Sequence, residues 1–565
     1  MLLGLGLAWL IVTVLLLVAG WRHVKSGEDR LQQLRDEHDV ANLLHSGDQL
    51  RAAQGDLAAA ADDLGSPFLA PLRVLPVVGR QIRSAVALAK GARDGTAAGV
   101  ALVDTFNSQV GAELAPGPPR VAALNALADA ADTAHQRLTT IDLGPSDALV
   151  GPLANARNDL QRNLAKATDL VGTAAAGSHA LATLLQGPQQ YLLFAANNAE
   201  MRAGSGMYLQ AGEVSTADGR FEVGDLVDTN ELALPEGAVP LEGVYAERWP
   251  FLKSTEEWRN LSATPRFDAT APLAAKMWQA SKGEAVDGVV VIDPYALKAL
   301  IEALGPVTLS DGTSVGADDV VPLLLHDQYR GIDQEGPANA GRRERQSEIV
   351  HVVLDELSKR QPDPVQLFRS MSSAVHGRHL MVWSQDPATE ATWVRLGAAG
   401  KVDANALGVS LLNRGANKLD WYTDVDVTVD AGAPTGTTRP VTITIDIANN
   451  TPDGQSGYIA GPRRDSATTY GEYKGILAVT LPGSFTNATF DGGAPSITRG
   501  PDGETSVVAT VVDVAQNGTV KVVLHVDAPI DATVRLVPSG RPRHEHWSIG
   551  GRSWADDVAH TVNLG

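Results

Sequence analysis

The 565-residue chain contains no cysteine. Disulfide bonds, thiolate catalysis and cysteine-ligated zinc or iron–sulfur sites are therefore excluded. This absence leaves the compartment open, although it suits an exported protein that folds without an oxidative system. Basic residues are in deficit, with 46 Lys and Arg against 66 Asp and Glu, so the formal net charge is −20. An acidic surface argues against general affinity for nucleic acid, because neutralising phosphates requires clustered basic residues.

Three common catalytic signatures are also missing: the nucleophile elbow, the phosphate-binding P-loop and the zinc-protease motif. What the chain does have is length and apolar content. With 565 residues and 44% apolar composition it can bury more than one core, and at about 150 residues per domain it predicts three or four domains.

The first feature along the chain is an uncharged apolar run at residues 2–21. A helix of that length spans about 30 Å, so we expect a transmembrane anchor, with a cleaved signal peptide and a buried helix as alternatives. Arg22 and Lys25 follow the run and nothing basic precedes it, so charge alone would keep the remaining chain cytoplasmic. The domain content favours a single-pass cell-membrane protein with its bulk extracytoplasmic, and Met1 as an internal start after a basic tail.

Helical signals dominate residues 22–186. Leucine recurs every seven residues from position 43 to position 64, which predicts one seam of a helix that packs on another. Packing within a bundle is favoured over a dimer, since four positions do not establish one. Breaks at residues 71–79, 116–119 and 144–145 predict about four helices, one beginning near Arg80, that form a stalk or bundle.

Short apolar runs alternate with helical segments from residue 187 to residue 419, which is typical of an α/β layer domain. Residues 192–194 and 289–292 predict buried strands, and residues 214–223 predict a hairpin. A helix is expected at residues 294–304, closed by Gly305. The last helix is expected from about Arg343 to Lys359, with a polar N-terminus that would favour an anion.

Three blocks in this region place glycines or cations where an anion can dock. They are YLLFAANNAEMRAGSGMY at residues 191–208, VDGVVVID at residues 286–293 leading to LGPV at 304–307, and GRRERQ at 341–346. The asparagine pair with EMR, the VDGVVVID strand, the turn LPVVG at residues 75–79 and the β-rich end of the chain resemble an actinobacterial envelope family, the domain of unknown function 4012. The resemblance spans most of the chain and brings little biochemistry with it.

The α/β region is also distantly similar to the LytR-CpsA-Psr catalytic domain, whose members transfer polyprenyl-pyrophosphate-linked glycopolymers onto peptidoglycan or related acceptors. LGPV resembles that family's aLGGV turn, and GRRERQ resembles its gRxxRQQ helix start. Arg202 stands where the family has an arginine after its first core strand. The resemblance implies that Arg202, Arg342, Arg345 and Gln346 bind a lipid pyrophosphate, and a guanidinium fork can pair two phosphate oxygens at once.

Two departures weaken this similarity. The transferases place an aspartate that helps to hold a metal soon after the first arginine, whereas residues 203–206 here are AGSG. The transferases also have a later Arg–Asp pair, of which this chain keeps only the acid, Asp228. By the resemblance, Asp228 would be the catalytic and metal-binding carboxylate. Because phosphoryl transfer depends on neutralising developing charge, binding is expected to survive more readily than catalysis. The glycines after Arg202 are an alternative anion site, a nest of backbone amides.

Each candidate also has a structural interpretation. Residues 342–345 can be a solvated helix start that pairs with nearby acids, and Arg202 can close a loop by bonding carbonyls. Asp228 can be an N-cap or turn residue, and the asparagines at 197 and 198 are expected to be turn residues. The histidines of HEH at residues 544–546 could bind a metal, but chance explains them better.

From about residue 420 to residue 565 the pattern alternates and is β-branched. Five strands are predicted, at residues 425–429, 441–447, 476–481, 507–512 and 520–526. They predict an antiparallel β-sandwich of immunoglobulin type without a disulfide. Such a module can bind glycan or protein, or only cover the α/β domain, and the fold alone does not decide between these roles.

The sequence therefore predicts a multidomain protein: a transmembrane helix at residues 1–21, a helical stalk or bundle at 22–186, a LytR-CpsA-Psr-like α/β domain at 187–419 and a β-sandwich at 420–565. We expect it to handle cell-envelope glycopolymers, with membrane lipid, a polyprenyl pyrophosphate glycan and a cell-wall polymer as partners and no nucleic acid.

Two mechanisms remain open. The enzyme hypothesis is glycopolymer transfer, with the arginines on the pyrophosphate and Mg²⁺ on Asp228. The alternative is a non-catalytic glycan- or lipid-binding, scaffold or adhesion protein. They differ in whether a second carboxylate, Glu200 or Asp225, lies within metal distance of Asp228.

Overall fold

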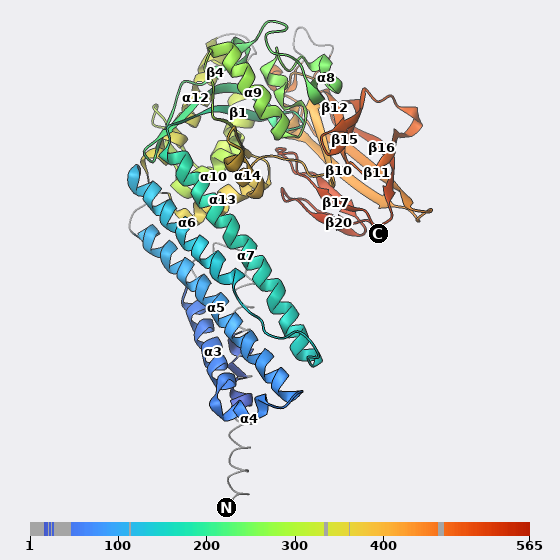
Figure 1. Cartoon of the computed structure of the whole chain (residues 1–565). Coiled ribbons are helices and arrows are strands. Elements are labelled where there is room, and N and C mark those ends of the chain that lie inside the picture. Colours follow the sequence, from blue (N-terminus) through green and yellow to red (C-terminus); the bar gives the residue numbers. More distant parts are fainter. Residues whose placement is uncertain are drawn as a thin grey trace, which may run out of the picture. The chain divides into compact units, whose positions relative to one another are not determined.

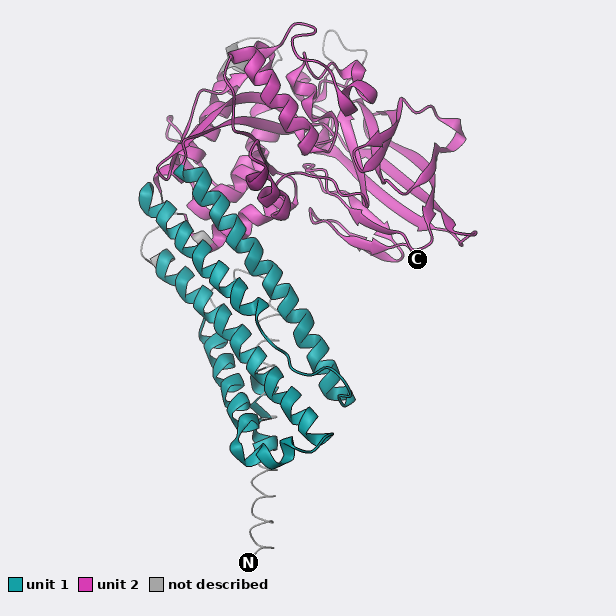
Figure 2. Ribbon diagram, in the orientation of Figure 1, with its two compact units in different colours: residues 1–186 teal, residues 187–565 magenta. Residues whose placement is uncertain are grey.

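The structure is a computed structural model that describes residues 16–20, 22–23, 25–27, 47–111, 115–332, 337–360, 362–461 and 468–565. The chain forms two compact units, Met1–Gln186 and Gly187–Gly565 (Figure 2). Apart from residues 16–20, the expected transmembrane run lies outside the described residues. Within the described ranges, no helix is both long and apolar enough to cross a membrane.

Unit 1 is helical, as expected (Figure 1). Its helices are α3 (Gly47–Gly65), α4 (Ala70–Arg73), α5 (Val78–Gly111), α6 (Pro118–Thr139) and α7 (Gly151–Gln186). Leu50, Leu57 and Leu64 are buried on one face of α3, so the seven-residue repeat packs within the bundle. Position 43 lies outside the described residues. The core is rich in alanine, with Ala60, Ala61 and Ala89 around Leu64, which lets the helices approach closely.

The first part of unit 2 is built on a mixed sheet with strand order β3-β2-β1-β5-β8, and a short strand β4 pairs with β2. Only β1 and β5 run parallel to each other, and the other pairs are antiparallel. The bounds are β1 (Gln189–Met201), β2 (Gly206–Ala217), β3 (Arg220–Val223), β4 (Val227–Asp228), β5 (Gly288–Ile292) and β8 (Leu380–Ser384). The two buried strands and the hairpin predicted from the sequence are confirmed.

Helices cover both faces of this sheet because successive strand residues point to opposite sides. Leu193 and Ala195 pack with α10 (Pro294–Leu304), α11 (Ala317–Leu325) and α12 (Pro337–Lys359). Leu192 and Phe194 pack on the other side with α9 (Phe267–Lys282) and Trp258. The central α/β domain is therefore confirmed. Its remaining elements include α8 (Gly243–Glu247), α13 (Pro364–His376), α14 (Pro387–Arg395) and the β6–β7 hairpin (Val307–Thr308 and Ser314–Val315).

One helix boundary was wrong. Helix α12 begins at Pro337 and not near Arg343. Proline fits the first turn of a helix, and Gly341 does not interrupt it. The paired arginines therefore lie in the second turn, so the argument for an anion at their helix N-terminus no longer applies to them.

The C-terminal part is β-rich, as predicted, and consists of two six-stranded sheets that share one core. The strand orders are β13-β16-β11-β10-β18-β19 and β14-β15-β12-β9-β17-β20. The bounds are β9 (Ala406–Asn413), β10 (Thr423–Ala431), β11 (Thr438–Asn449), β12 (Tyr473–Pro482), β13 (Thr486–Phe490), β14 (Thr498–Asp502), β15 (Thr505–Val514), β16 (Thr519–Pro529), β17 (Thr533–Leu536), β18 (His546–Ile549), β19 (Arg552–Trp554) and β20 (Thr561–Asn563). All five predicted strands are present.

Two features of the sandwich differ from the sequence-based expectation. Strand β9 belongs to it, pairing with β12 and β17, although residues 406–413 were assigned to the preceding domain. The β9–β17 and β10–β18 pairs are parallel, so the sandwich is not purely antiparallel. Strand β9 is buried at every residue, and it therefore lacks the alternating pattern that marks a half-exposed strand.

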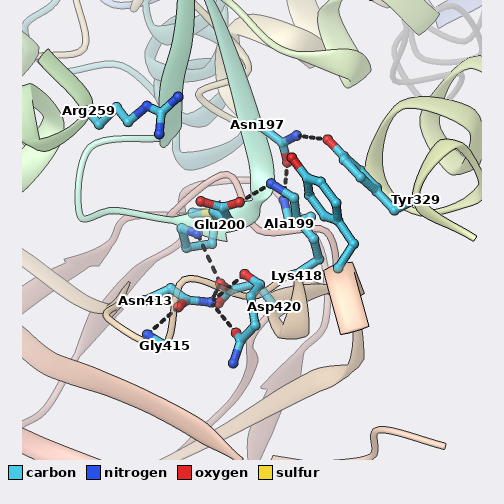
Figure 3. A network of polar contacts seen from close by, with 12 residues as sticks. Asn197, Ala199, Glu200, Arg259, Tyr329, Asn413, Gly415, Lys418 and Asp420 are labelled. Atoms are coloured by element: carbon cyan, nitrogen blue, oxygen red, sulfur yellow. Dashed lines mark hydrogen bonds and ion pairs between the residues drawn. The ribbon is translucent and has the colours of Figure 1, made fainter. Parts of the chain in front are cut away.

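The α/β domain and the sandwich are packed together within unit 2. An apolar cluster joins Tyr245, Trp249 and Ala263 of the first to Leu412 and Ile476 of the second. Polar contacts beside it link the end of β1 to the sandwich (Figure 3).

Candidate functional site

The polar side chains at the carboxyl end of β1 form the central cluster of unit 2. Strands β1 and β5 are parallel, so their carboxyl ends meet at one edge of the sheet, where α/β folds bind ligands. Here β1 continues past Ala195, its last residue paired with β5, to Met201. The Met201 amide donates to buried Asp420 of the sandwich at 3.0 Å. The sandwich therefore contacts this edge of the sheet directly.

Asn197 and Asn198 are buried strand residues and not turn residues, contrary to expectation. Asn197 Nδ2 donates to the Tyr329 hydroxyl at 2.7 Å (Figure 3). Asn198 Nδ2 donates at 2.7 Å both to Asp293 and to the Gly540 carbonyl. Each Nδ2 group therefore has a buried partner, and the pair connects β1 to three other segments of the chain.

Asp420 is the hub on the sandwich side (Figure 3). Besides the Met201 amide, its carboxylate accepts hydrogen bonds from Asn413 Nδ2 at 2.9 Å and the Tyr473 hydroxyl at 3.1 Å, and Arg541 lies 3.4 Å away. Burial raises the pKa of Asp420, and Arg541 and these donors oppose that shift. The full set of partners makes Asp420 a structural carboxylate.

Arg202 closes a loop at this junction. Its Nη1 donates to the carbonyls of Met201 at 2.9 Å and Asn413 at 2.8 Å, and its Nε donates to Asn260 at 3.2 Å. Burial, assisted by the charge of Arg414, lowers the pKa of Arg202 to about 10. This geometry matches the carbonyl-bonding interpretation, because three hydrogen bonds already engage the guanidinium that was expected to bind pyrophosphate.

The glycines after Arg202 serve close packing. A Cβ on Gly204 would lie 2.6 Å from the Thr264 carbonyl oxygen, and one on Gly206 would lie 2.3 Å from the Asn197 backbone. The Gly204 amide donates to Ser262 at 2.9 Å, so it is not directed at an external anion. The proposed backbone nest therefore lacks that amide.

Asp228 is not a hydrogen-bond partner of Arg202. It lies at the start of the 3₁₀ turn η2 (Thr229–Leu232). One carboxylate oxygen accepts from the Asn230 amide at 2.9 Å, so Asp228 is an N-cap. The same oxygen lies 3.0 Å from Arg259, and the other lies 3.7 Å from Arg343. Two guanidinium groups therefore converge on the carboxylate that was expected to hold Mg²⁺.

Arg342 and Gln346 do lie together, but they face the junction. Arg342 Nη1 donates to Gln346 at 3.2 Å, and Nη2 donates to the Tyr458 hydroxyl at 3.3 Å. The guanidinium lies 5.0 Å from the ring centre of Tyr329 and 5.4 Å from that of Tyr458, and these two rings stack. Such cation–π contacts stabilise the buried charge. Burial raises the pKa of Tyr329 to about 12, against the opposing effect of Arg342.

A second cation contacts the same tyrosines. Lys418 Nζ lies 4.8 Å from the Tyr329 ring centre and 5.7 Å from that of Tyr458. Its ammonium forms an ion pair with Glu200 (Figure 3). Glu200 is thus the partner of a buried lysine.

Arg345 projects elsewhere. It pairs with Asp311 at 3.1 Å and donates to the Thr313 hydroxyl at 3.2 Å, both in the β6–β7 turn. The structure therefore does not gather the predicted residues into one pocket: Arg342 and Gln346 are together, whereas Arg202, Asp228 and Arg345 each have separate partners.

A second polar chain runs from the end of β5 to the C-terminal segment. His379 Nδ1 lies 2.6 Å from Asp293 and its Nε2 lies 3.2 Å from Asp557, which in turn pairs with His544 at 2.8 Å. Burial lowers the pKa of His379, but the charges and hydrogen bonds of Asp293 and Asp557 outweigh burial and raise it to about 10. The neighbouring His546 pairs with Asp426, so the HEH histidines do not share a partner.

Comparison with known proteins gives one match to a family model, over part of the chain. Residues 186–329 match the family model described as "Protein of unknown function (DUF4012)". This match supports the resemblance inferred from the sequence. No curated protein and no solved structure matches the chain.

The DUF4012 match covers β1, Arg202, Asp228, Arg259 and Tyr329 and ends before Arg342. Part of the junction between the α/β domain and the sandwich therefore lies in the matched segment. The rest comes from α12 and the sandwich. Among the described residues, no group of three or more His, Asp or Glu side chains is placed to hold a metal. Neither Glu200 nor Asp225 completes such a group with Asp228.

Several residues of these clusters escaped the sequence analysis. Arg259, Lys418, Asp420 and His379 stand in no motif, and their partners are distant in the sequence. Arg343 could have been identified from the sequence, because it belongs to GRRERQ. The family resemblance, however, assigned the binding role to Arg342 and Arg345. The helical register of α12 decides which of the three arginines reaches Asp228.

Proposed function

We propose that this chain is a non-catalytic binding protein of the cell envelope that recognises an anionic, phosphate-bearing glycan or its polyprenyl-linked precursor. The observation that carries the proposal is the state of Asp228. Its carboxylate caps η2 and faces Arg259 and Arg343, and among the described residues it belongs to no group of three His, Asp or Glu side chains that could hold a metal. A metal-dependent transferase needs that carboxylate for a cation.

The same arrangement supports anion binding. Asp228 occupies the place between two guanidinium groups where a phosphate would fit, and guanidinium pairs phosphate as readily as carboxylate. Arg343 is 47% exposed, so a ligand can reach it from solvent. The site would thus bind a phosphate group in competition with an internal carboxylate.

The location is proposed from the sequence. The apolar run at residues 2–21 and the resemblance to an envelope family favour a single-pass protein with its bulk extracytoplasmic. The junction between the α/β domain and the sandwich supports a rigid binding body, because the buried Glu200–Lys418 ion pair and an apolar cluster hold the two together.

Asp228→Asn separates binding from transfer. Asparagine caps a helix as well as aspartate does, so the fold should persist. Under the binding proposal the substitution removes the competing charge and tightens binding of a polyprenyl pyrophosphate by about ten-fold, equivalent to about 1.4 kcal/mol. Arg343→Gln should weaken binding by a similar factor, and Arg395→Gln, on exposed α14, should leave it unchanged.

The binding measurements are calorimetric titrations of the purified chain with polyprenyl pyrophosphate, with Mg²⁺ and with chelator. Transfer is assayed separately, as release of polyprenyl phosphate from a polyprenyl-pyrophosphate-linked glycan in the presence of a cell-wall polymer as acceptor. If the native chain transfers the glycan only with Mg²⁺ and Asp228→Asn abolishes transfer, the enzyme hypothesis replaces this proposal. If neither the native chain nor the Asp228→Asn variant binds the ligand, the binding proposal is wrong and the scaffold hypothesis is left.

A further inference from the structure

The turn between α3 and α5 exposes an unusual number of apolar side chains. In residues 67–78, Val74 is 82% exposed and Val77 is 71% exposed. Three further large apolar side chains on this turn are exposed: Phe68, Leu75 and Val78. Scattered apolar residues are normal on a surface, but a contiguous group of this size marks an interaction site. We call residues 67–78 the apolar turn.

The apolar turn is held in shape by its own backbone. The Gly79 amide donates to the Leu75 carbonyl at 2.8 Å. A Cβ on Gly79 would lie 2.1 Å from the Arg73 carbonyl oxygen, so only glycine allows this approach. Two arginines stabilise the same turn. Arg73 donates a hydrogen bond to the Leu64 carbonyl, and Arg83 donates one to the Arg73 carbonyl. The apolar side chains are therefore presented by an ordered structure, which explains the LPVVG segment noted in the sequence.

A basic groove lies next to this turn. It has a volume of about 790 Å³ and is lined by four cations, Arg73, Arg83, Lys90 and Arg137. Two acids also line it, but Asp94 pairs with Arg93 and Asp142 accepts a bond from the Gly144 amide. Within the described part of unit 1, no carboxylate lies within ion-pair distance of Lys90 or Arg137. The groove is locally positive in a chain with a net charge of −20.

The path of the chain identifies what meets this surface. Gly20 lies against Leu64, and Gly27 lies against Leu57 and Ala53, so the described residues between positions 16 and 27 run antiparallel to α3. Residue 16 is consequently the end nearest the apolar turn. The residues that precede it in the sequence are the uncharged run that begins at residue 2. Residues 2–15 would cover only about 21 Å as a helix, less than the hydrocarbon thickness of about 30 Å, but an apolar segment that enters the lipid there would bring the bilayer surface to the apolar turn.

The dimensions also fit a bilayer. At 1.5 Å per residue, Arg83 lies about 8 Å and Lys90 about 18 Å along α5 from Val78. The headgroup layer on each side of the hydrocarbon is roughly 5–8 Å thick. With Val77 at the hydrocarbon boundary and α5 along the membrane normal, Arg83 would lie about 9 Å out, at the outer edge of the headgroups, and Lys90 would lie about one Debye length beyond them.

We propose that this end of the bundle docks on an anionic lipid surface, with the apolar turn in the interface and the groove cations facing the lipid phosphates. The proposal goes beyond glycan binding and does not involve the Asp228 site. The occupant is a bilayer surface, because an adjoining apolar run, exposed apolar side chains and a groove lined by cations are all explained by that partner.

The absence of cysteine makes a direct test simple, since Val77→Cys creates a unique labelling position. The full chain is reconstituted into phosphatidylcholine vesicles with or without phosphatidylglycerol and labelled with an environment-sensitive fluorophore. Lipids that carry a nitroxide at the headgroup should quench this probe. The matched control is Leu181→Cys, an exposed leucine of α7. It lies two residues after His179, which pairs with Asp132 of α6, toward the other end of the bundle.

The groove has its own test. Arg83→Gln, made in the Val77→Cys chain, should lower the ratio of quenched to unquenched probe by up to about five-fold, and only when phosphatidylglycerol is present. Adding Lys90→Gln should lower the ratio further by a smaller factor, because salt screens the lipid charge over that distance. Lys166→Gln, a cation of α7 outside the groove, should leave the ratio unchanged. Quenching at Val77 but not at Leu181 supports docking. Absent quenching at Val77, or equal quenching at both positions, overturns it. None of these outcomes depends on the Asp228 site.

Discussion

The pH dependence of stability gives the sharpest test of the structure, through His379. This side chain is buried between Asp293 and Asp557, with Tyr295 stacked on its ring and His544 on the far side of Asp557. Its pKa rises from an ordinary 6.5 to about 10. At 1.36 kcal/mol per pKa unit, this corresponds to roughly 5 kcal/mol in favour of the folded state.

The sign follows from proton binding. Because the folded pKa is the higher one, the stabilisation is complete below about pH 6.5 and is lost as the pH rises toward 10. The free energy of unfolding of unit 2 should therefore fall by about 1.4 kcal/mol per pH unit through this range from His379 alone. Tyr295 does not interfere, since burial raises its pKa as well and keeps it neutral.

The perturbation is His379→Gln, which keeps a hydrogen-bond donor and removes the charge. At pH 6 the variant should be less stable than the native chain by about 3–5 kcal/mol, because two carboxylates lose a buried cation. The difference should shrink steadily as the pH rises toward 10. His376→Gln, on an exposed face of α13, is the matched control and should follow the native curve.

The assay is urea unfolding at a series of pH values, followed by tryptophan fluorescence. All but two of the ten tryptophans lie in residues 187–565, so the signal reports unit 2. Urea is uncharged and does not screen the ion pairs. A difference between native and variant chains that stays constant from pH 6 to pH 9.5 would refute the reasoning.

Two further changes test the junction and the apolar turn. Lys418→Met leaves Glu200 without its buried partner and should cost about 3–5 kcal/mol in urea unfolding of unit 2, and an unchanged midpoint would mean that the ion pair does not hold the junction. Gly79→Ala forces a Cβ against the Arg73 carbonyl and should lower the melting temperature of the helical circular dichroism signal, at a cost of about 1–3 kcal/mol. Gly99→Ala, in open space on the same helix, should raise stability slightly, and equal effects of the two substitutions would contradict the close approach.

The architecture was largely readable from local patterns. Proline and glycine breaks divide the helices of unit 1, and runs such as residues 289–292 are apolar enough to mark buried strands. These signals work because period and composition reflect which face of an element is buried. Strand β9 shows where they fail, since a strand buried on both faces carries no alternation.

The candidate site was much less predictable. Motif position suggested that Arg202, Arg342 and Arg345 would act together, yet each has different partners. Adjacent residues on a helix point to different sides, so Arg342 contacts Tyr458 whereas Arg343 faces Asp228, and only the packing around α12 decides which of them reaches that carboxylate. Lys418 and Asp420 gave no signal, because an isolated charged residue in the sequence is expected to be exposed.

By itself, the sequence determined the order of the parts: an apolar run, a helical bundle, a layered α/β region and a β-rich end. Each of these follows from composition and periodicity within one segment. Only the tertiary structure decided which polar residues meet, because the ion pairs Glu200–Lys418 and Asp293–His379 join residues 218 and 86 positions apart. Burial then determines which of these charges hold the fold together and which, like Arg343, remain accessible to a ligand.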